Sequence, residues 1–120
     1  MAVVVLDAGH GGTKDPGAVF EDRQEKDDTL ALTLAVGRLL AEDPDIDVVY
    51  TRETDVYDTP LVKARKANAA NADYFVSIHR NSTPVPSTYS GVETLVYSKG
   101  TLAETLARNI ASALSAIGFA

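Results

Sequence analysis

His10 and His79 are the only histidines in this chain of 120 residues, and each lies just past an apolar run rich in β-branched residues. Such runs, at residues 2–6 and 74–78, are typical of strands buried on both faces of a parallel sheet. Open α/β sheets place their chemistry in the crevice beyond the carboxyl ends of the strands. We therefore expect the two imidazoles to meet in one crevice.

A carboxylate completes the group. Glu25 stands at the start of a helix that apolar residues at helical spacing predict for residues 26–41. Two neutral imidazoles and a carboxylate suit Zn²⁺, and three protein ligands leave a fourth position for water. Zinc lowers the pKa of that water to about 7 and polarises a carbonyl under attack. His10, Glu25 and His79 thus predict a site for one zinc ion that supplies a hydroxide nucleophile.

Each of these residues also has an ordinary structural interpretation. A single histidine at the end of a strand is more often a hydrogen-bonded structural residue than a metal ligand. Glu25 alone would be a solvated carboxylate that the helix dipole favours in the first turn. The metal interpretation rests on all three, because they fall on the same side of the predicted sheet. Asp7 and Asn81 are close enough in sequence to orient a ring nitrogen as outer partners of the ligands.

Other kinds of site receive less support. The glycine-rich turn after the first strand could cradle a phosphate, but the helix begins well after the glycines, and neither GxGxxG nor GxxxxGK[ST] is present. The nucleophile elbow G-x-S-x-G of serine hydrolases is also absent. Arg52, Arg65 and Arg80 could contact a carboxylate, but we expect each of them on the surface. A binding domain without metal stays open as an alternative.

Composition narrows the classes of partner. The net charge of −6 disfavours sequence-independent binding to nucleic acid, which requires a basic surface. Without cysteine, the chain has neither disulfides nor thiolate metal ligands. No apolar run approaches the length that spans a bilayer, and Asp7 interrupts the N-terminal apolar run too early for a signal peptide. Any export route is therefore not visible in this chain.

Strand and helix patterns alternate along the chain. Strands are expected at 2–6, 45–51, 74–78 and 91–97, helices at 26–41, 61–71 and 101–117, and polar loops at 13–24 and 82–90. Thr101 and Glu104 form a capping-box pattern, and Gly118 stands at the C-terminal end of the last helix. The order β-α-β-α-β-β-α predicts an α/β fold: a single domain with a mostly parallel or mixed sheet flanked by helices.

A set of short motifs extends from the first strand to the last helix. They are LDAGHGG at 6–12, DPGA at 15–18, EK at 25–26, TRETD at 51–55, AN at 67–68, ADYFVSIHRN at 72–81 and GVE at 91–93. With these motifs the chain resembles the zinc-dependent N-acetylmuramoyl-L-alanine amidases of the type 3 family. No single motif is specific, but their combination is.

The resemblance implies a mixed sheet flanked by helices, with zinc held by His10, Glu25 and His79. It also implies hydrolysis of the amide that joins N-acetylmuramic acid to the L-alanine of the peptidoglycan stem. Peptidoglycan would then be the partner, and the bacterial cell wall, extracellular or periplasmic, the place of action. Arg80, Asn81 and Glu93 would border the cleft and contact the glycan or the stem peptide.

The chain departs from the family pattern in three places. Ala8 replaces a common proline, which should matter little, and Lys63 replaces a usual arginine, so that a structural salt bridge there is expected to be weaker or absent. The family also carries a glutamate, acting as general base or acid, on a strand beyond the last helix here. Nothing in this chain corresponds to it. Glu93 is the candidate to replace it, with Glu21 and Asp22 as further possibilities.

Two expectations follow from that third departure. Residues 1–120 would be a zinc amidase catalytic domain that is incomplete at its C-terminal end, with a partner or second copy covering the uncovered sheet edge. The alternative function is that of a catalytically silent, zinc-containing module that lacks the acid/base glutamate. Such a module would bind the cell wall or have a regulatory role.

Overall fold

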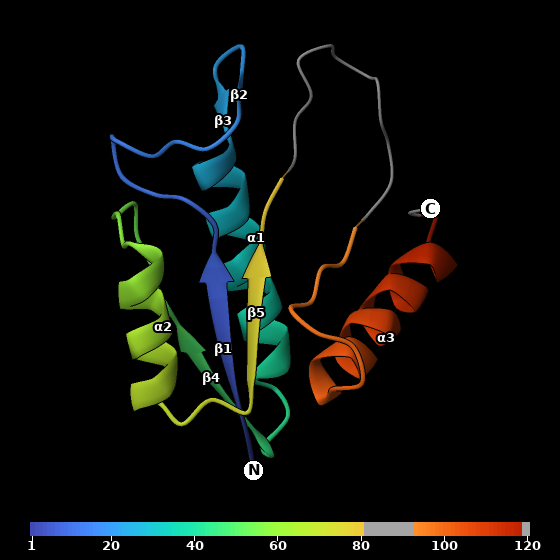
Figure 1. The fold of residues 1–120 in the computed structure, drawn as a ribbon. Coiled ribbons are helices and arrows are strands. Elements are labelled where there is room, and N and C mark those ends of the chain that lie inside the picture. The colour runs from blue at the N-terminus through green and yellow to red at the C-terminus, as the bar shows by residue number, and fades with distance from the viewer. Residues whose placement is uncertain (81–92, 119–120) are drawn as a thin grey trace. The chain divides into compact units, whose positions relative to one another are not determined.

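The computed structural model describes residues 1–80 and 93–118, and the chain forms two compact units, Met1–Ser82 and Thr83–Ala120. The first unit contains β1 (Ala2–Ala8), β2 (Val19–Phe20), β3 (Arg23–Gln24), α1 (Glu25–Leu40), β4 (Ile46–Tyr50), α2 (Pro60–Ala69) and β5 (Tyr74–Ile78). The second contains α3 (Leu102–Ala116). Figure 1 shows these elements in chain order.

The first unit is built on a parallel sheet with the strand order β4-β1-β5. The central strand β1 pairs with both neighbours, and Leu6 lies opposite Tyr50 of β4 and Val76 of β5. Val5 and Leu6 are almost completely buried, as expected for a central strand covered on both faces. All three strands run in the same direction, so their carboxyl ends lie at one edge of the sheet (Figure 1).

The two helices of this unit contact opposite faces of the sheet. Tyr50 and its neighbour Leu6 face α1, where the Tyr50 ring fills the space beside Gly37. Asp7 faces the other way, because side chains alternate along a strand, and Lys63 of α2 reaches its carboxylate. The fold class predicted from the sequence, an α/β sheet flanked by helices, is confirmed.

Individual elements test the sequence patterns more closely. The helices at 26–41, 61–71 and 101–117 and the strands at 2–6, 45–51 and 74–78 are confirmed to within one or two residues. The strand expected at 91–97 is wrong over its described part, since residues 93–97 form no strand. Leu95 and Tyr97 are exposed and pair with no neighbouring strand among the described residues, and β-propensity alone does not make a ladder.

The loop expected at 13–24 also contains more structure than predicted. Val19–Phe20 and Arg23–Gln24 pair as a short antiparallel hairpin, with Glu21 at a positive φ of 55° in its turn. Strands of two residues are too short to give a periodic pattern, so the sequence did not reveal them. The loop expected at 82–90 lies wholly outside the described residues.

The second unit contributes an amphipathic helix. The Thr101 hydroxyl accepts a hydrogen bond from the Glu104 amide at 3.2 Å, which confirms the predicted N-terminal cap of α3. Gly118, with a φ of +107°, follows its C-terminal end as expected. No helix among the described residues is both long enough and apolar enough to cross a membrane.

Candidate metal centre

Three side chains meet at the carboxyl edge of the sheet. His10 Nε2 lies 3.2 Å from Glu25 Oε2, and His79 Nδ1 lies 3.1 Å from the same oxygen. The two imidazole nitrogens are 3.3 Å apart, and the rings stand edge to face with an interplanar angle of 89°. The structure therefore brings together all three residues that the sequence singled out as metal ligands.

His10 reaches this point through an unusual backbone. Its φ of +65° is left-handed, a conformation that few residues other than glycine adopt and that often occurs at functional sites. Gly17 passes so close that a Cβ there would lie 2.6 Å from the His10 ring and 2.8 Å from Glu25 Oε1. The glycine-rich loops thus bring the main chain directly against the ligand side chains.

Glu25 is a buried carboxylate, with only 4% of its surface exposed. Burial acts to raise its pKa, but the backbone amides of Ala18 and Arg80 donate hydrogen bonds at 3.0 Å, which lower it. The net result is a pKa below the usual value, so this carboxyl group is ionised. A solvated carboxylate at the helix start, the ordinary interpretation of this residue, is therefore wrong.

Asp15 orients the His10 ring. Its Oδ1 lies 2.8 Å from His10 Nδ1. A carboxylate only accepts hydrogen bonds, so Nδ1 carries the proton and donates a hydrogen bond to Asp15. The lone pair of Nε2 is then directed at the other two donor atoms. The expectation that Asp7 orients an imidazole is wrong, since its carboxylate is engaged elsewhere, and Asn81 lies outside the described residues. Asp7 and Asp15 are both close to His10 in the sequence, so sequence distance alone could not show which of them orients its ring.

The donor chemistry tests whether a metal ion fits. Metal binding requires neutral imidazoles. With the His10 proton on Nδ1, its Nε2 then faces the ionised Glu25 carboxylate without a proton, and a single proton on His79 Nδ1 can serve only one of these two neighbours. A cation among the three atoms satisfies all of them. Donors bound about 2.0–2.1 Å from a tetrahedral zinc ion lie about 3.3 Å apart, which matches the observed spacings. The three residues fit zinc.

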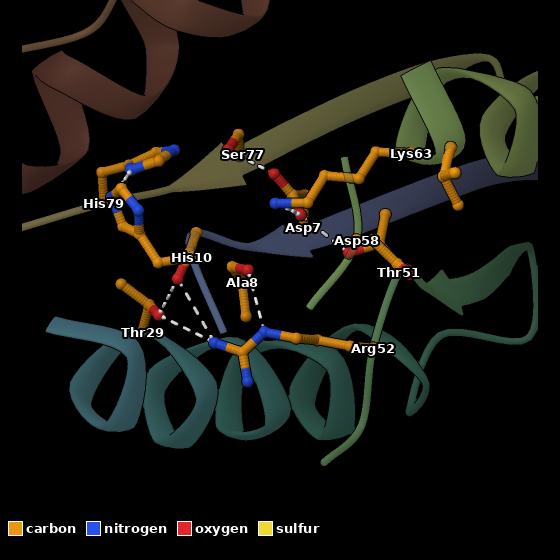
Figure 2. Close-up of polar contacts among 12 residues, drawn as sticks. Asp7, Ala8, His10, Thr29, Thr51, Arg52, Asp58, Lys63, Ser77 and His79 are labelled. Carbon is orange, nitrogen blue, oxygen red and sulfur yellow. Dashed lines mark hydrogen bonds and ion pairs between the residues drawn. The ribbon is translucent and has the colours of Figure 1, made fainter. Parts of the chain in front are cut away.

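A second polar cluster lies beside the candidate centre, around Asp7 (Figure 2). The hydroxyls of Thr51 and Ser77 each donate a hydrogen bond at 2.7 Å, and Lys63 Nζ lies at 3.0 Å. Burial acts to raise the pKa of Asp7, but these three donors outweigh it and lower the pKa. The salt bridge of Lys63, expected to be weaker or absent, is therefore present.

Arg52 is the largest departure from the expected surface positions. It is 4% exposed, because its guanidinium donates hydrogen bonds to the carbonyls of Ala8, Gly9, Lys26 and Thr54. Figure 2 shows it between the end of β1 and the first turns of α1. No sequence pattern indicates this role, because every residue has the main-chain carbonyl that Arg52 contacts.

The remaining predicted residues have different positions. Arg65 is exposed on α2, as expected. Arg80 is partly buried, and its guanidinium contacts Asp28 at 3.0 Å and the Ala18 carbonyl at 3.3 Å. Glu93 belongs to the second unit, so its role at the site stays a prediction.

Comparisons with known proteins show to which family the chain belongs. A family model described as N-acetylmuramoyl-L-alanine amidase, type 3, matches residues 4–118. The chain belongs to this family. An endolysin of Bacillus phage SPP1 is 48% identical to it over 82 residues, which cover 68% of the chain and 30% of the endolysin.

Two solved structures of the amidase family match almost the whole chain. An N-acetylmuramoyl-L-alanine amidase from Clostridium difficile 630 superimposes with a TM-score of 0.88 and 34% identity, covering 96% of this chain and 63% of that one. The catalytic domain of an amidase from Bacillus (Paenibacillus) polymyxa var. colistinus gives 0.83 and 36%, covering 96% and 65%. The chain thus spans somewhat under two thirds of these solved structures and less than a third of the endolysin.

Proposed function

We propose that this chain hydrolyses the amide bond between N-acetylmuramic acid and L-alanine in peptidoglycan, with one zinc ion held by His10, Glu25 and His79. The observation that carries the proposal is the triangle of facing donor atoms, 3.1–3.3 Å apart, at the carboxyl edge of the sheet. Membership of the amidase family supports the choice of bond.

The protein's part is to hold an ionised, correctly oriented ligand set. Asp15 keeps the His10 proton on Nδ1, and the amides of Ala18 and Arg80 hold both oxygens of the Glu25 carboxylate. When bound, zinc supplies a Lewis acid for the amide carbonyl and a hydroxide nucleophile at neutral pH. His10, Glu25 and His79 would hold the ion through one carboxylate and two neutral imidazoles.

We propose Arg80 as a residue that contacts the substrate. It follows His79 directly, and its guanidinium, one third exposed, already pairs with Asp28. We propose that it meets a polar group of the stem peptide or glycan, together with Asn81. Glu93 keeps its role as the proposed replacement for the family's acid/base glutamate, worth about 10²–10⁴-fold in rate.

The place of action follows from the same assignment. We propose that the protein acts on the bacterial cell wall, on the extracellular or periplasmic side, as the resemblance to a phage endolysin suggests. We also propose that a partner or second copy covers the uncovered edge of the sheet. This is the side edge formed by an outer strand, not the carboxyl edge where the candidate metal site lies. A related amidase, from Clostridioides difficile, has been solved in complex with the GerS lipoprotein, with 35% identity and a TM-score of 0.59.

Mass spectrometry of purified peptidoglycan after incubation with the chain tests the proposal. The expected result is release of stem peptides that begin with free L-alanine, in added zinc but not in chelator. His79→Ala should abolish the release, whereas the exposed control Arg65→Met should not change it. A folded, zinc-loaded chain that releases no peptide would instead support the silent binding or regulatory module.

A further inference from the structure

We propose that the segment 51–55 positions the metal ligands, with Arg52 as the central positioning residue. This inference rests on the proposed zinc site, because it concerns how that site is held in shape. His10 and Glu25 lie on different segments, a loop after β1 and the first turn of α1. Their donor atoms must stay 3.2 Å apart for one ion to bind both.

Arg52 ties these two segments together through their main chains. Its Nη2 donates to the carbonyl of Gly9 at 3.2 Å and to the carbonyl of Lys26 at 2.9 Å. Gly9 immediately precedes His10, and Lys26 immediately follows Glu25. One guanidinium nitrogen therefore joins the residues next to two of the three ligands.

The far side of the His10 loop is held by the same segment. Asp55 accepts a hydrogen bond from the Gly12 amide at 2.7 Å and one from Lys26 Nζ at 2.6 Å. Lys26 Nζ also donates to the Gly12 carbonyl at 3.1 Å. Arg52 and Asp55 thus fix the loop on both sides of His10 and join it to α1.

The backbone at His10 explains why such a clamp is required. A left-handed φ of +65° at a residue other than glycine costs free energy and persists only where neighbouring contacts over-determine it. Arg52 Nε also donates to the Ala8 carbonyl at 3.2 Å, so the planar fork reaches two consecutive carbonyls before the strained residue. A lysine ammonium keeps the charge but cannot reproduce this fork.

Arg52→Lys is the decisive variant, with Arg65→Met as a charge-changing control on the exposed face of α2. Zinc affinity is measured by competition with a chromophoric chelator, using protein that circular dichroism shows to be folded. We expect Arg52→Lys to bind zinc about 10–100-fold more weakly than the unchanged chain. This is the typical loss of metal affinity when a residue that supports the metal ligands is replaced. The control should bind zinc as the unchanged chain does.

A second readout separates positioning from general destabilisation. Cobalt(II) bound in place of zinc reports ligand geometry through its visible absorption, which a merely less stable fold with an intact site would leave unchanged. We expect the Arg52→Lys spectrum to differ from that of the unchanged chain. If Arg52→Lys does not fold, Asp55→Ala takes its place, since Asp55 is about half exposed.

Zinc affinity and cobalt spectrum equal to those of the unchanged chain in the folded variant would overturn the inference. An unchanged chain that binds no zinc would overturn the proposed function itself, so the two failures are distinguishable.

Discussion

Asp7 and Glu25 are both buried carboxylates with lowered pKa values at the carboxyl edge of the sheet, but their neighbours are of opposite kinds. Asp7 faces two hydroxyls and an ammonium group, all of them donors. Glu25 is held by two backbone amides and also faces two imidazole nitrogens. The Asp7 carboxylate has its cation, Lys63, within the protein, whereas the Glu25 cluster could hold an added cation.

This difference separates a cluster that stabilises the fold from the one that we propose binds a metal ion. A buried carboxylate with donors on every side contributes to stability and has no capacity left for a ligand. At the Glu25 cluster, lone pairs of the carboxylate and of two imidazoles converge, and the His79 ring is exposed. Binding a cation there would lower the electrostatic energy of the cluster. Breaking each cluster in turn should therefore affect different measurements.

The largest expected effect is loss of metal binding in His79→Ala. Removing one of three ligands should reduce zinc binding from about one ion per chain to none that survives dialysis, measured by elemental analysis. Stability of the metal-free protein should change little, because the His79 side chain is 45% exposed. Retention of one zinc per chain would remove His79 from the site.

Lys63→Met should show the opposite pattern. It leaves the buried Asp7 carboxylate without its cation, which typically costs about 3 kcal/mol in the free energy of unfolding. Zinc affinity of the folded protein should stay unchanged. Urea unfolding measures the loss.

Lys66→Met, on the same helix, is the matched control for Lys63→Met. The Lys66 side chain is 42% exposed, against 14% for Lys63, so its loss should cost less than that of Lys63 even though it pairs with Asp58 and donates to the Thr51 carbonyl at 2.6 Å. Equal losses of stability for the two lysines would contradict the contrast between a buried ammonium group and a more exposed one.

Asp15→Ala sharpens the comparison from within the metal site. Without its acceptor, the His10 ring is free to place its proton on either nitrogen, and zinc affinity should fall about 10–100-fold. Because the Asp15 side chain is 37% exposed, the free energy of unfolding of the metal-free protein should change by less than about 1 kcal/mol. A chelator competition assay and urea unfolding give the two values.

A change of pH should separate the two clusters without mutation. The lowered pKa of Asp7 means that its stabilising contribution is fully present above its unfolded pKa, about 3.9, and is lost as the pH falls through the lower folded value. Zinc needs neutral imidazoles and leaves as acid protonates them. Near pH 5 we expect reduced zinc occupancy with the Asp7 contribution intact, measured by dialysis and by comparing the urea unfolding of Lys63→Met with that of the unchanged chain.

Much of the fold was readable from local patterns. The buried strands, the amphipathic helices and the cap at Thr101 depend on residue types that lie close together in the sequence, and these predictions are confirmed. The three ligand candidates could be named because parallel strands deliver their carboxyl ends to one edge. The strand expected at 91–97 was wrong over residues 93–97, because a strand also needs a partner that propensity cannot supply.

The sequence by itself determined the α/β class, the edge at which the chemistry lies and the three donors that converge there. Only the tertiary structure decided which carboxylate serves which partner. Asp15 rather than Asp7 orients His10, and Arg52 is a buried clamp rather than a surface charge. The physical reason is that these roles depend on contacts with main-chain groups and with residues far away in the chain, which leave no periodic pattern in the sequence.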